Sequence, residues 1–233
     1  MRHFNVDNDT MTKHSPENFN NKSFTIGRIA CLITFILGVI YAIVTSIGFL
    51  ELKSPQEPIS NPWFTLMEIL DILIAFSMAV SMTAVHNYAL PVDKTYSLMA
   101  AVFMYLMTGI TSCVHFVILV MNNFYRPEQI PGFSFFFSFK WPSVGYALDI
   151  LAWDWFFALS MLLGASVFKF GQLAKPVRFL MIISGILSLI GLLGVPLNNM
   201  QIRNIGIIGY ALVAPIIFLL ISIIFRRLDK NQI

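Results

Sequence analysis

Six stretches of apolar residues, each about as long as a membrane-spanning helix, constrain this chain more than any other feature of its sequence. They cover residues 26–50, 63–85, 95–121, 143–168, 177–197 and 205–225. A helix needs about 20 mostly apolar residues to cross the hydrocarbon core of a bilayer. Backbone groups find no water there, so a single-segment span must bond its own backbone as a helix. The sequence therefore predicts an all-α, polytopic membrane protein, a bundle of six transmembrane helices.

The composition agrees with a membrane protein and argues against several other classes. Of the 233 residues, 57% are hydrophobic and 12% are charged, whereas soluble domains have about 25% charged residues. The net charge of +3 comes without a basic patch, which argues against nucleic acid as a partner. Cys31 and Cys113 both lie in apolar stretches, so no disulfide framework is indicated. The lipid bilayer is the expected partner, and the oligomeric state stays open.

The polar segments are short and lie mainly at the two ends of the chain. Residues 1–24 are rich in Asn and show no apolar periodicity, which predicts a flexible tail. Residues 25–226 form the predicted six-helix transmembrane domain, and residues 227–233 a short C-terminal segment. No segment between the apolar stretches is long enough for a water-soluble domain.

The distribution of Lys and Arg predicts the orientation in the membrane. One side of the predicted membrane carries Arg2, Lys13, Lys22, Arg28, Lys94, Lys169, Lys175, Arg178, Arg226, Arg227 and Lys230. The other side carries Lys53, Arg126, Lys140 and Arg203. Basic residues are in excess on the cytoplasmic side of membrane proteins. Both termini are therefore predicted to be cytoplasmic, with the protein in the plasma membrane.

Four acidic residues lie inside the apolar stretches: Glu68 and Asp71 in the second, Asp149 and Asp154 in the fourth. No Lys or Arg lies deep in any stretch to pair with them. A carboxylate in the membrane is costly, usually faces the bundle interior, and is by default a functional candidate. At ~1.5 Å per residue, the four acids lie about 8–17 Å below the outer boundary, and His115 of the third stretch lies about 9 Å below it. These five side chains are predicted to face one another.

Helical spacing sorts these side chains into faces. The two acids of the second stretch are three residues apart and share one face. In the fourth stretch, Tyr146, Asp149 and Trp153 share a face at a spacing of three and four residues. In a regular α-helix, five residues place Asp154 about 140° away from Asp149. Only one of these two acids is then expected to face a shared cavity.

The third stretch carries a polar stripe of Thr108, Thr111 and His115, with Ser112 at its edge. Such side chains form hydrogen bonds between membrane helices, and His115 taken alone fits this structural role. The candidate ligand-binding or ion-binding residues are Glu68, Asp71, Thr111, His115, Tyr146, Asp149, Trp153 and Asp154.

Three functions are compatible with buried acids of this kind. Carboxylates in contact share a proton, which favours a small carrier or ligand-binding protein whose outward-facing acidic cavity takes a proton, a cation or a cationic small molecule. Ionised carboxylates and an imidazole also suit a divalent metal. Glu68, Asp71, His115 and Asp149 are its candidate ligands, and such a metal would activate water in an intramembrane enzyme. The third function is a structural or sensor subunit in which the acids bridge helices at about 0.6 kcal/mol each. The first is the leading prediction, and no catalytic residue is assigned.

An internal repeat is a further hypothesis. The motif Leu-Asp-Ile-Leu occurs at residues 70–73 and again at 148–151, each time after a Pro-Trp or Trp-Pro pair. Membrane bundles are often built from duplicated units. Leu and Ile are frequent in any span, so coincidence remains the alternative.

Two segments predict irregular structure near the acidic residues. The loop of residues 122–142 is rich in aromatic side chains, which are typical of the membrane interface. It is interpreted as a loop lying along the membrane, and a lid over an outward-facing cavity is the alternative. Pro215, in the middle of the sixth stretch, cannot donate a backbone hydrogen bond and predicts a kink.

Overall fold

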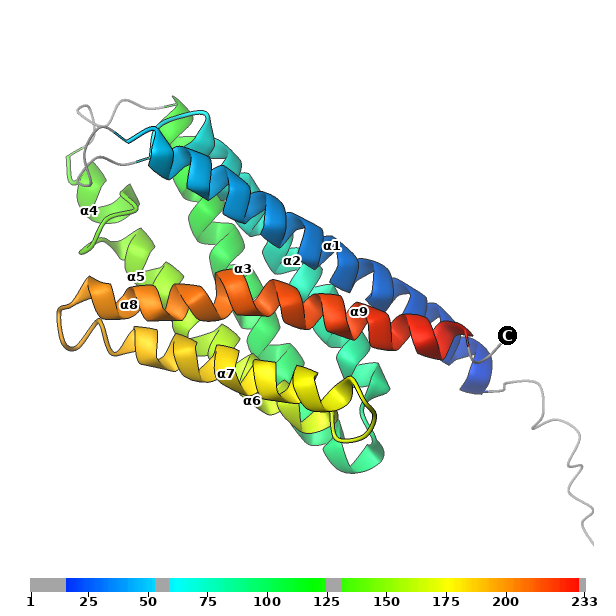
Figure 1. Ribbon diagram of the computed structural model, residues 1–233. Helices are drawn as coiled ribbons and strands as arrows, with labels where there is room; N and C mark the ends of the chain where they lie inside the picture. Colours follow the sequence, from blue (N-terminus) through cyan, green and yellow to red (C-terminus); the bar gives the residue numbers. More distant parts are fainter. Residues whose placement is uncertain (1–15, 53–58, 125–130, 231–233) are drawn as a thin grey trace, which may run out of the picture.

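The computed structural model describes residues 16–52, 59–124 and 131–230, and in this part of the chain all regular secondary structure is helical, with no strand (Figure 1). Six helices are long and apolar enough to cross a membrane. They span Lys22–Leu50, Trp63–Tyr88, Pro91–Met121, Val144–Val167, Ala174–Leu192 and Met200–Leu228. The prediction of an all-α bundle with six membrane-spanning helices is confirmed.

The first three spans are continuous helices, and the fourth and sixth are interrupted. The first three are α1 (Pro16–Leu50), α2 (Trp63–Tyr88) and α3 (Lys94–Phe124), the last preceded by the turn η2 (Pro91–Asp93). After the short α4 (Phe133–Phe137), the fourth span consists of α5 (Val144–Ile150), η4 (Leu151–Phe156), α6 (Phe157–Gly164) and η5 (Ala165–Val167). The fifth is α7 (Ala174–Leu192), and the sixth consists of α8 (Met200–Ile207), η6 (Ile208–Val213) and α9 (Ala214–Lys230).

The six spans form a closed ring in chain order. Each span packs against the next one along the chain, and α9 packs against α1 to close the ring. Both described ends, the start of α1 and the end of α9, lie at the same end of the bundle (Figure 1). Because the ring is closed, side chains from different spans meet in one shared interior.

The outer surface of the ring is apolar. Large side chains such as Ile36, Ile43, Phe76 and Phe116 are between 46% and 59% exposed. An apolar surface of this extent would promote aggregation in water, whereas in a bilayer it is the surface that contacts lipid.

Hydroxyl groups connect neighbouring spans inside the ring. Thr108 Oγ1 of α3 donates to the carbonyl of Ala75 in α2 at 2.9 Å. Ser160 of α6 donates to a carbonyl of α3 at 2.8 Å, and Ser184 of α7 to one of η6 at 2.9 Å. Interhelical hydrogen bonds of this kind help to hold membrane helices together.

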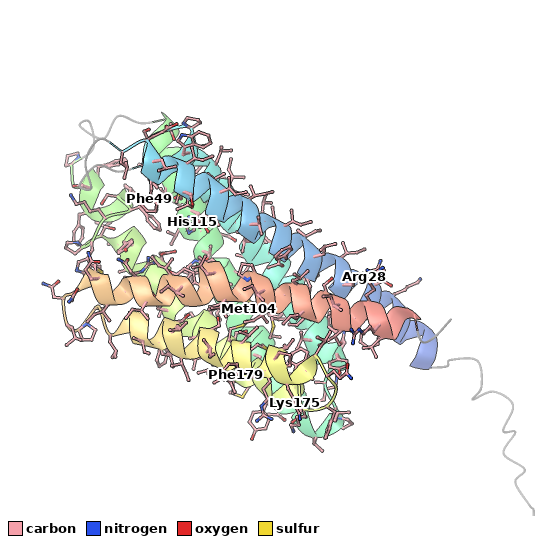
Figure 2. The ribbon with its side chains drawn as sticks, viewed as in Figure 1. Arg28, Phe49, Met104, His115, Lys175 and Phe179 are labelled. Carbon is pink, nitrogen blue, oxygen red and sulfur yellow. The ribbon has the colours of Figure 1, made fainter. Side chains whose placement is uncertain are left out.

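The half of the bundle next to the termini has an apolar interior, which we call the apolar half. Methionines fill it, among them Met82, Met104, Met161 and Met181, all at most 1% exposed. It ends in a cluster of aromatic rings from four spans, Phe24, Tyr88, Phe168 and Phe225. Beyond this cluster, the Asp93 carboxylate and Lys169 Nζ form an ion pair of 2.6 Å between η2 and the end of the fourth span. Figure 2 places Arg28 and Lys175 at this same end of the molecule.

Several boundaries differ from those predicted. The predicted flexible tail of residues 1–24 includes the start of α1, which is helical from Pro16, and residues 1–15 lie outside the described part of the chain. The fifth span ends at Leu192 and not at residue 197. The sixth begins at Met200 and not at residue 205, because the Asn199 side chain caps it by accepting the Gln201 N–H at 3.0 Å. The last helix continues to Lys230, and residues 231–233 are not described.

The fourth and sixth spans each contain one π-helical segment, which hydropathy alone does not predict. These segments are η4 and η6. A π-helical turn closes i→i+5 hydrogen bonds, accommodates one extra residue and is often found at functional sites. The two segments touch each other, with the Trp153 and Tyr210 ring centroids 5.1 Å apart. The second ends at Val213, two residues before Pro215, the residue predicted to disturb this helix.

Candidate functional site

Buried charged and titratable side chains from four spans meet in the half of the bundle away from the termini, which we call the charged half. The most deeply buried are Asp154 at 0% exposure, His115 at 1%, Glu68 at 2%, Asp149 at 3% and Arg203 at 5%. The Asp71 side chain, at 14%, is the most exposed of the group. We call these six residues the charge network. The structure thus brings together all four acids selected from the sequence, with His115 between them.

His115 bridges the acids of the second and fourth spans. Its Nδ1 lies 3.0 Å from Glu68 Oε2 and 3.7 Å from Asp71 Oδ2. Its Nε2 lies 3.4 Å from Asp149 Oδ1. The two Leu-Asp-Ile-Leu motifs therefore supply one acid to each nitrogen of the imidazole. Carboxylate oxygens, and not the neighbouring Thr and Ser hydroxyls, therefore face both ring nitrogens of His115.

Arg203 completes the network, and the sequence analysis placed it wrongly. Its Nη2 donates to Asp149 Oδ2 at 2.7 Å, and its Nε lies 3.6 Å from Asp154 Oδ2. The prediction that Arg203 lies outside the spans, and that the acids have no basic partner inside them, is therefore wrong. The first residues of this helix, Met-Gln-Ile-Arg-Asn, include three polar residues, so hydropathy does not show where the helix starts. Asn199, which precedes them, is a residue type that often caps a helix. That capping signal, one turn before Arg203, would have extended the sixth span to include it.

Aromatic rings flank the Arg203 guanidinium. Its central carbon lies 4.9 Å from the centroid of the Tyr146 ring and 5.9 Å from that of Tyr210. Cations are attracted to the faces of aromatic rings at such distances. Tyr146, a candidate from the sequence, therefore contributes to the site through Arg203.

The π-helical segment η4 lets both acids of the fourth span approach the same arginine. A regular helix would place Asp154 about 140° from Asp149. The i→i+5 turn brings residues five apart toward the same side, so Asp149 and Asp154 both lie within 4 Å of Arg203. Of the two acids, Asp149 lines the cavity described below and Asp154 does not.

Asp154 occupies a narrow niche between the fifth and sixth spans. Neither of its carboxylate oxygens has a hydrogen-bond partner among the described residues. Two glycines form the niche. A Cβ added at Gly191 would come within 2.8 Å of Asp154 Oδ1, and one added at Gly206 would overlap that oxygen. Both positions need glycine for the three helices to approach this closely.

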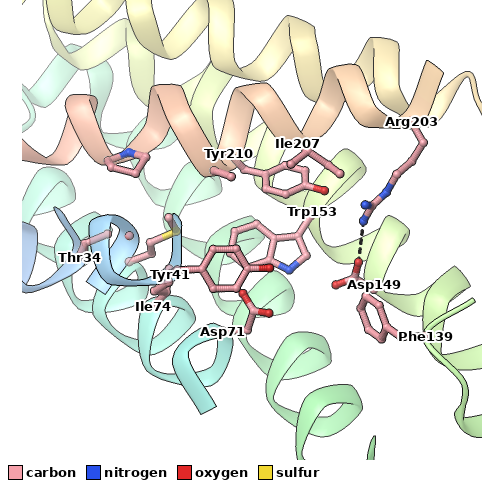
Figure 3. Close-up of a pocket in the computed structure, with 14 residues that line it drawn as sticks. Thr34, Tyr41, Asp71, Ile74, Phe139, Asp149, Trp153, Arg203, Ile207 and Tyr210 are labelled. Carbon is pink, nitrogen blue, oxygen red and sulfur yellow. Dashed lines mark hydrogen bonds and ion pairs between the residues drawn. The ribbon is translucent and has the colours of Figure 1, made fainter. Parts of the chain in front are cut away.

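A cavity of about 80 Å³ lies beside the charge network, between the first, second, fourth and sixth spans (Figure 3). Its walls include Tyr41, Asp71, Phe139, Trp153, Arg203 and Tyr210. A water molecule needs roughly 10–15 Å³ of such space, so the cavity has room for several waters or one small organic group. Glu68, His115 and Asp154 lie behind its walls.

Phe139 connects the aromatic loop to this site. Its ring centroid lies 5.5 Å from that of His115 and 5.3 Å from that of Tyr146. In the same loop, Phe135 and Phe136 are 56% and 49% exposed, as expected for a segment at the membrane interface. The loop therefore places Phe139 against the site, and Phe135 and Phe136 on the outer surface. Residues 125–130 of the loop are not described.

Thr111 is the one candidate that the structure leaves apart from the network. It is fully buried, and its hydroxyl donates to the Met107 sulfur at 3.5 Å. This contact lies within α3, so Thr111 has a packing role in the structure.

The acids outnumber the basic groups in the charge network. Four carboxylates face one guanidinium and one imidazole. Even with His115 protonated, two negative charges would remain without a positive partner. Buried charges are strongly unfavourable unless they are paired or neutralised. Two further positive charges, from protons or from bound cations, would be needed to neutralise the site.

The arrangement is not that of a metal centre. No group of three or more His, Cys, Asp or Glu side chains is arranged to hold a metal ion in the described part of the chain. Both His115 nitrogens face carboxylate oxygens at 3.0–3.7 Å, instead of sharing a common centre with them.

Comparisons with known proteins give no relative from which a function could be transferred. No family model, no curated protein and no solved structure matches this chain.

Proposed function

We propose that this protein is a small membrane carrier, or ligand-binding membrane protein, whose cavity takes up a proton or a small cation. The excess of four carboxylates over Arg203 and His115, next to the cavity, carries this proposal. Buried acids inside membrane bundles are typical of ion pathways and proton relays.

Asp71 is the proposed point of contact with the ligand. It lines the cavity, and it is the least buried of the four acids. Its one ion-pair partner among the described residues is His115, at 3.7 Å, and the same nitrogen is already hydrogen-bonded to Glu68 at 3.0 Å. A cation arriving at Asp71 would therefore meet an acid whose charge is only weakly compensated.

His115 supports a coupling between the ligand and a proton. A positive charge at Asp71 weakens the attraction between the acids and a protonated imidazole. His115 would then release a proton when the ligand binds and take one up when it leaves. Exchange of this kind makes carrier function the preferred form of the proposal.

The orientation proposed from the sequence opens the cavity toward the outside of the plasma membrane. The charged half lies away from the termini, which the excess of Lys and Arg would keep in the cytoplasm. Arg203 lies in a helix and not in an outer loop. The excess of Lys and Arg on the side of the termini persists when Arg203 is left out of the count.

Currents from reconstituted protein test the proposal. Liposomes containing the purified chain would be exposed to concentration jumps of protons, Na⁺, K⁺ and methylammonium, and charge movement recorded on a solid-supported membrane. We expect a transient current for at least one of these cations, and its loss in Asp71→Asn.

Asp93→Asn is the matched control, since Asp93 is also a buried acid but is paired with Lys169 in the apolar half. It should keep the current. The absence of current for all four cations, or equal currents in Asp71→Asn and the parent, would contradict the proposal. Thermal unfolding of each variant separates loss of binding from loss of the fold.

A further inference from the structure

We propose that the cation bound in this cavity is a small protonated amine, carrying at least one N–H group and a short apolar substituent. This inference rests on the proposed function and names its substrate class. It is argued from the walls of the cavity, from the acid that faces it and from an unpaired hydroxyl.

The walls of the cavity suit an organic cation. Tyr41, Phe139, Trp153 and Tyr210 contribute aromatic rings from four separate segments (Figure 3). Aromatic faces attract ammonium groups, and cages of such rings recognise alkylated amines. The remaining walls are largely apolar and include Ile74, Met78 and Ile207. An apolar substituent on the ligand would pack against them.

The same walls are poorly suited to a bare inorganic ion. Hard cations such as Ca²⁺ require about six to eight oxygen ligands. In this cavity one of the two carboxylates, Asp149, is already bonded to Arg203 at 2.7 Å. Besides Asp71, the other side-chain oxygens on the walls are the hydroxyl oxygens of Thr34, Tyr41 and Tyr210. These side chains together supply fewer oxygens than the six to eight that such an ion requires.

Two groups remain to accept hydrogen bonds from a ligand. Asp71 reaches the cavity with only a 3.7 Å contact to His115 among the described residues. The Tyr210 hydroxyl is buried and has no hydrogen-bond partner in the part of the chain that the structure describes. Unpaired buried polar groups are rare in folded proteins and call for an explanation. A ligand with an N–H group, bound in the cavity that Asp71 and Tyr210 both line, would donate a hydrogen bond to the Asp71 carboxylate.

Arg203 also lines the cavity but does not repel a cation as a free arginine would. Its guanidinium is neutralised by Asp149 and lies close to Asp154, and it is flanked by the Tyr146 and Tyr210 rings. Asp71 is then the acid whose charge acts on the cavity with the least compensation. The electrostatic attraction of the cavity is therefore for a positive charge, such as that of an ammonium group.

Binding measurements on the full chain in detergent test this inference. Methylammonium, tetramethylammonium and K⁺ would be titrated at constant ionic strength, followed by calorimetry and by Trp fluorescence. We expect saturable binding of methylammonium, at least tenfold weaker binding of tetramethylammonium because it has no N–H, and no saturable binding of K⁺. Equal affinity for methylammonium and tetramethylammonium, or saturable binding of K⁺ alone, would overturn the inference.

Two tryptophans of η4 provide a matched pair of variants. Trp153 lines the cavity and is 4% exposed, whereas Trp155 is 41% exposed on the outer surface. Trp153→Leu should weaken methylammonium binding at least tenfold, Trp153→Phe should retain most of it, and Trp155→Leu should leave it unchanged. Equal losses in the two Leu variants would contradict a role for the aromatic wall.

The outcomes separate this inference from the proposed function. Currents for protons or K⁺ in the parent, without methylammonium binding, would overturn the amine inference and leave the carrier in place. Neither currents nor binding of any cation would overturn both.

Discussion

The two halves of the bundle are built from the same six spans and have opposite interiors. Met82, Met104 and Met161 fill the apolar half, whereas the same helices bring Glu68, His115 and Asp149 together in the charged half. The outer surfaces of the two halves are both apolar. The apolar outer surface of the ring is thus what hydropathy detects as membrane-spanning. The difference between the two interiors indicates where the function lies.

The two interiors also differ in how they contribute to stability. Membrane helices associate through close packing and hydrogen bonds, because lipid tails are as apolar as a buried Leu. Flexible, polarisable methionine side chains fill irregular gaps and tolerate replacement. Ion pairs in the charged half depend on each partner, since removal of one leaves the other buried and unpaired. We therefore expect the charged half to be far more sensitive to conservative substitution.

The largest effect is expected for Arg203→Gln. It removes the guanidinium that pairs with Asp149 at 2.7 Å and lies near Asp154. Loss of one partner of a buried ion pair costs about 3–5 kcal/mol. Thermal or denaturant unfolding in detergent would measure it.

The control for this variant is Arg178→Gln, because Arg178 is exposed. A combined Arg203→Gln and Asp149→Asn variant should regain part of the lost stability, since it also removes the unpaired charge. Equal stability of Arg203→Gln and Arg178→Gln would mean that the charge network does not contribute to the fold.

An intermediate effect is expected for Gly206→Ala. The added methyl group would overlap the Asp154 carboxylate, and overpacking of a filled site costs about 1–3 kcal/mol. Gly109→Ala is the matched control, because nothing lies within 4 Å of a Cβ at that position. It should be neutral, or stabilising by up to about 1 kcal/mol from helix propensity. If unfolding experiments show equal stability for the two alanine variants, the niche around Asp154 is not close-packed.

The smallest effect is expected for Met104→Leu in the apolar half. Met104 is fully buried, but hydrophobic replacements of similar volume usually cost less than ~1.5 kcal/mol. Neither the cation currents nor methylammonium binding should change. A loss of binding in this variant would remove the functional distinction between the two halves.

The sequence was sufficient for the fold and for part of the site. Apolar length alone predicted the six spans, and counting residues from the span ends brought Glu68, Asp71, His115 and Asp149 to a common depth. Arg203 was missed because hydropathy begins the last span only after its polar first turn. The approach of Asp154 to the same arginine was missed because periodicity assumes one constant helical repeat. The cavity depends on how side chains from four spans pack, which one-dimensional patterns do not contain.

The two π-helical segments have a consequence for the register of their helices. Each α-helical residue advances the helix by about 100°, and a π-helical turn accommodates one residue more than an α-helical turn. Each segment therefore acts as an insertion of one residue absorbed within a single turn. Deletion of one residue between Asp149 and Asp154 would therefore restore a uniform α-helix and keep the parts on either side of η4 in their present orientation. The two acids would then be four residues apart, a spacing that leaves both on the same face of the helix.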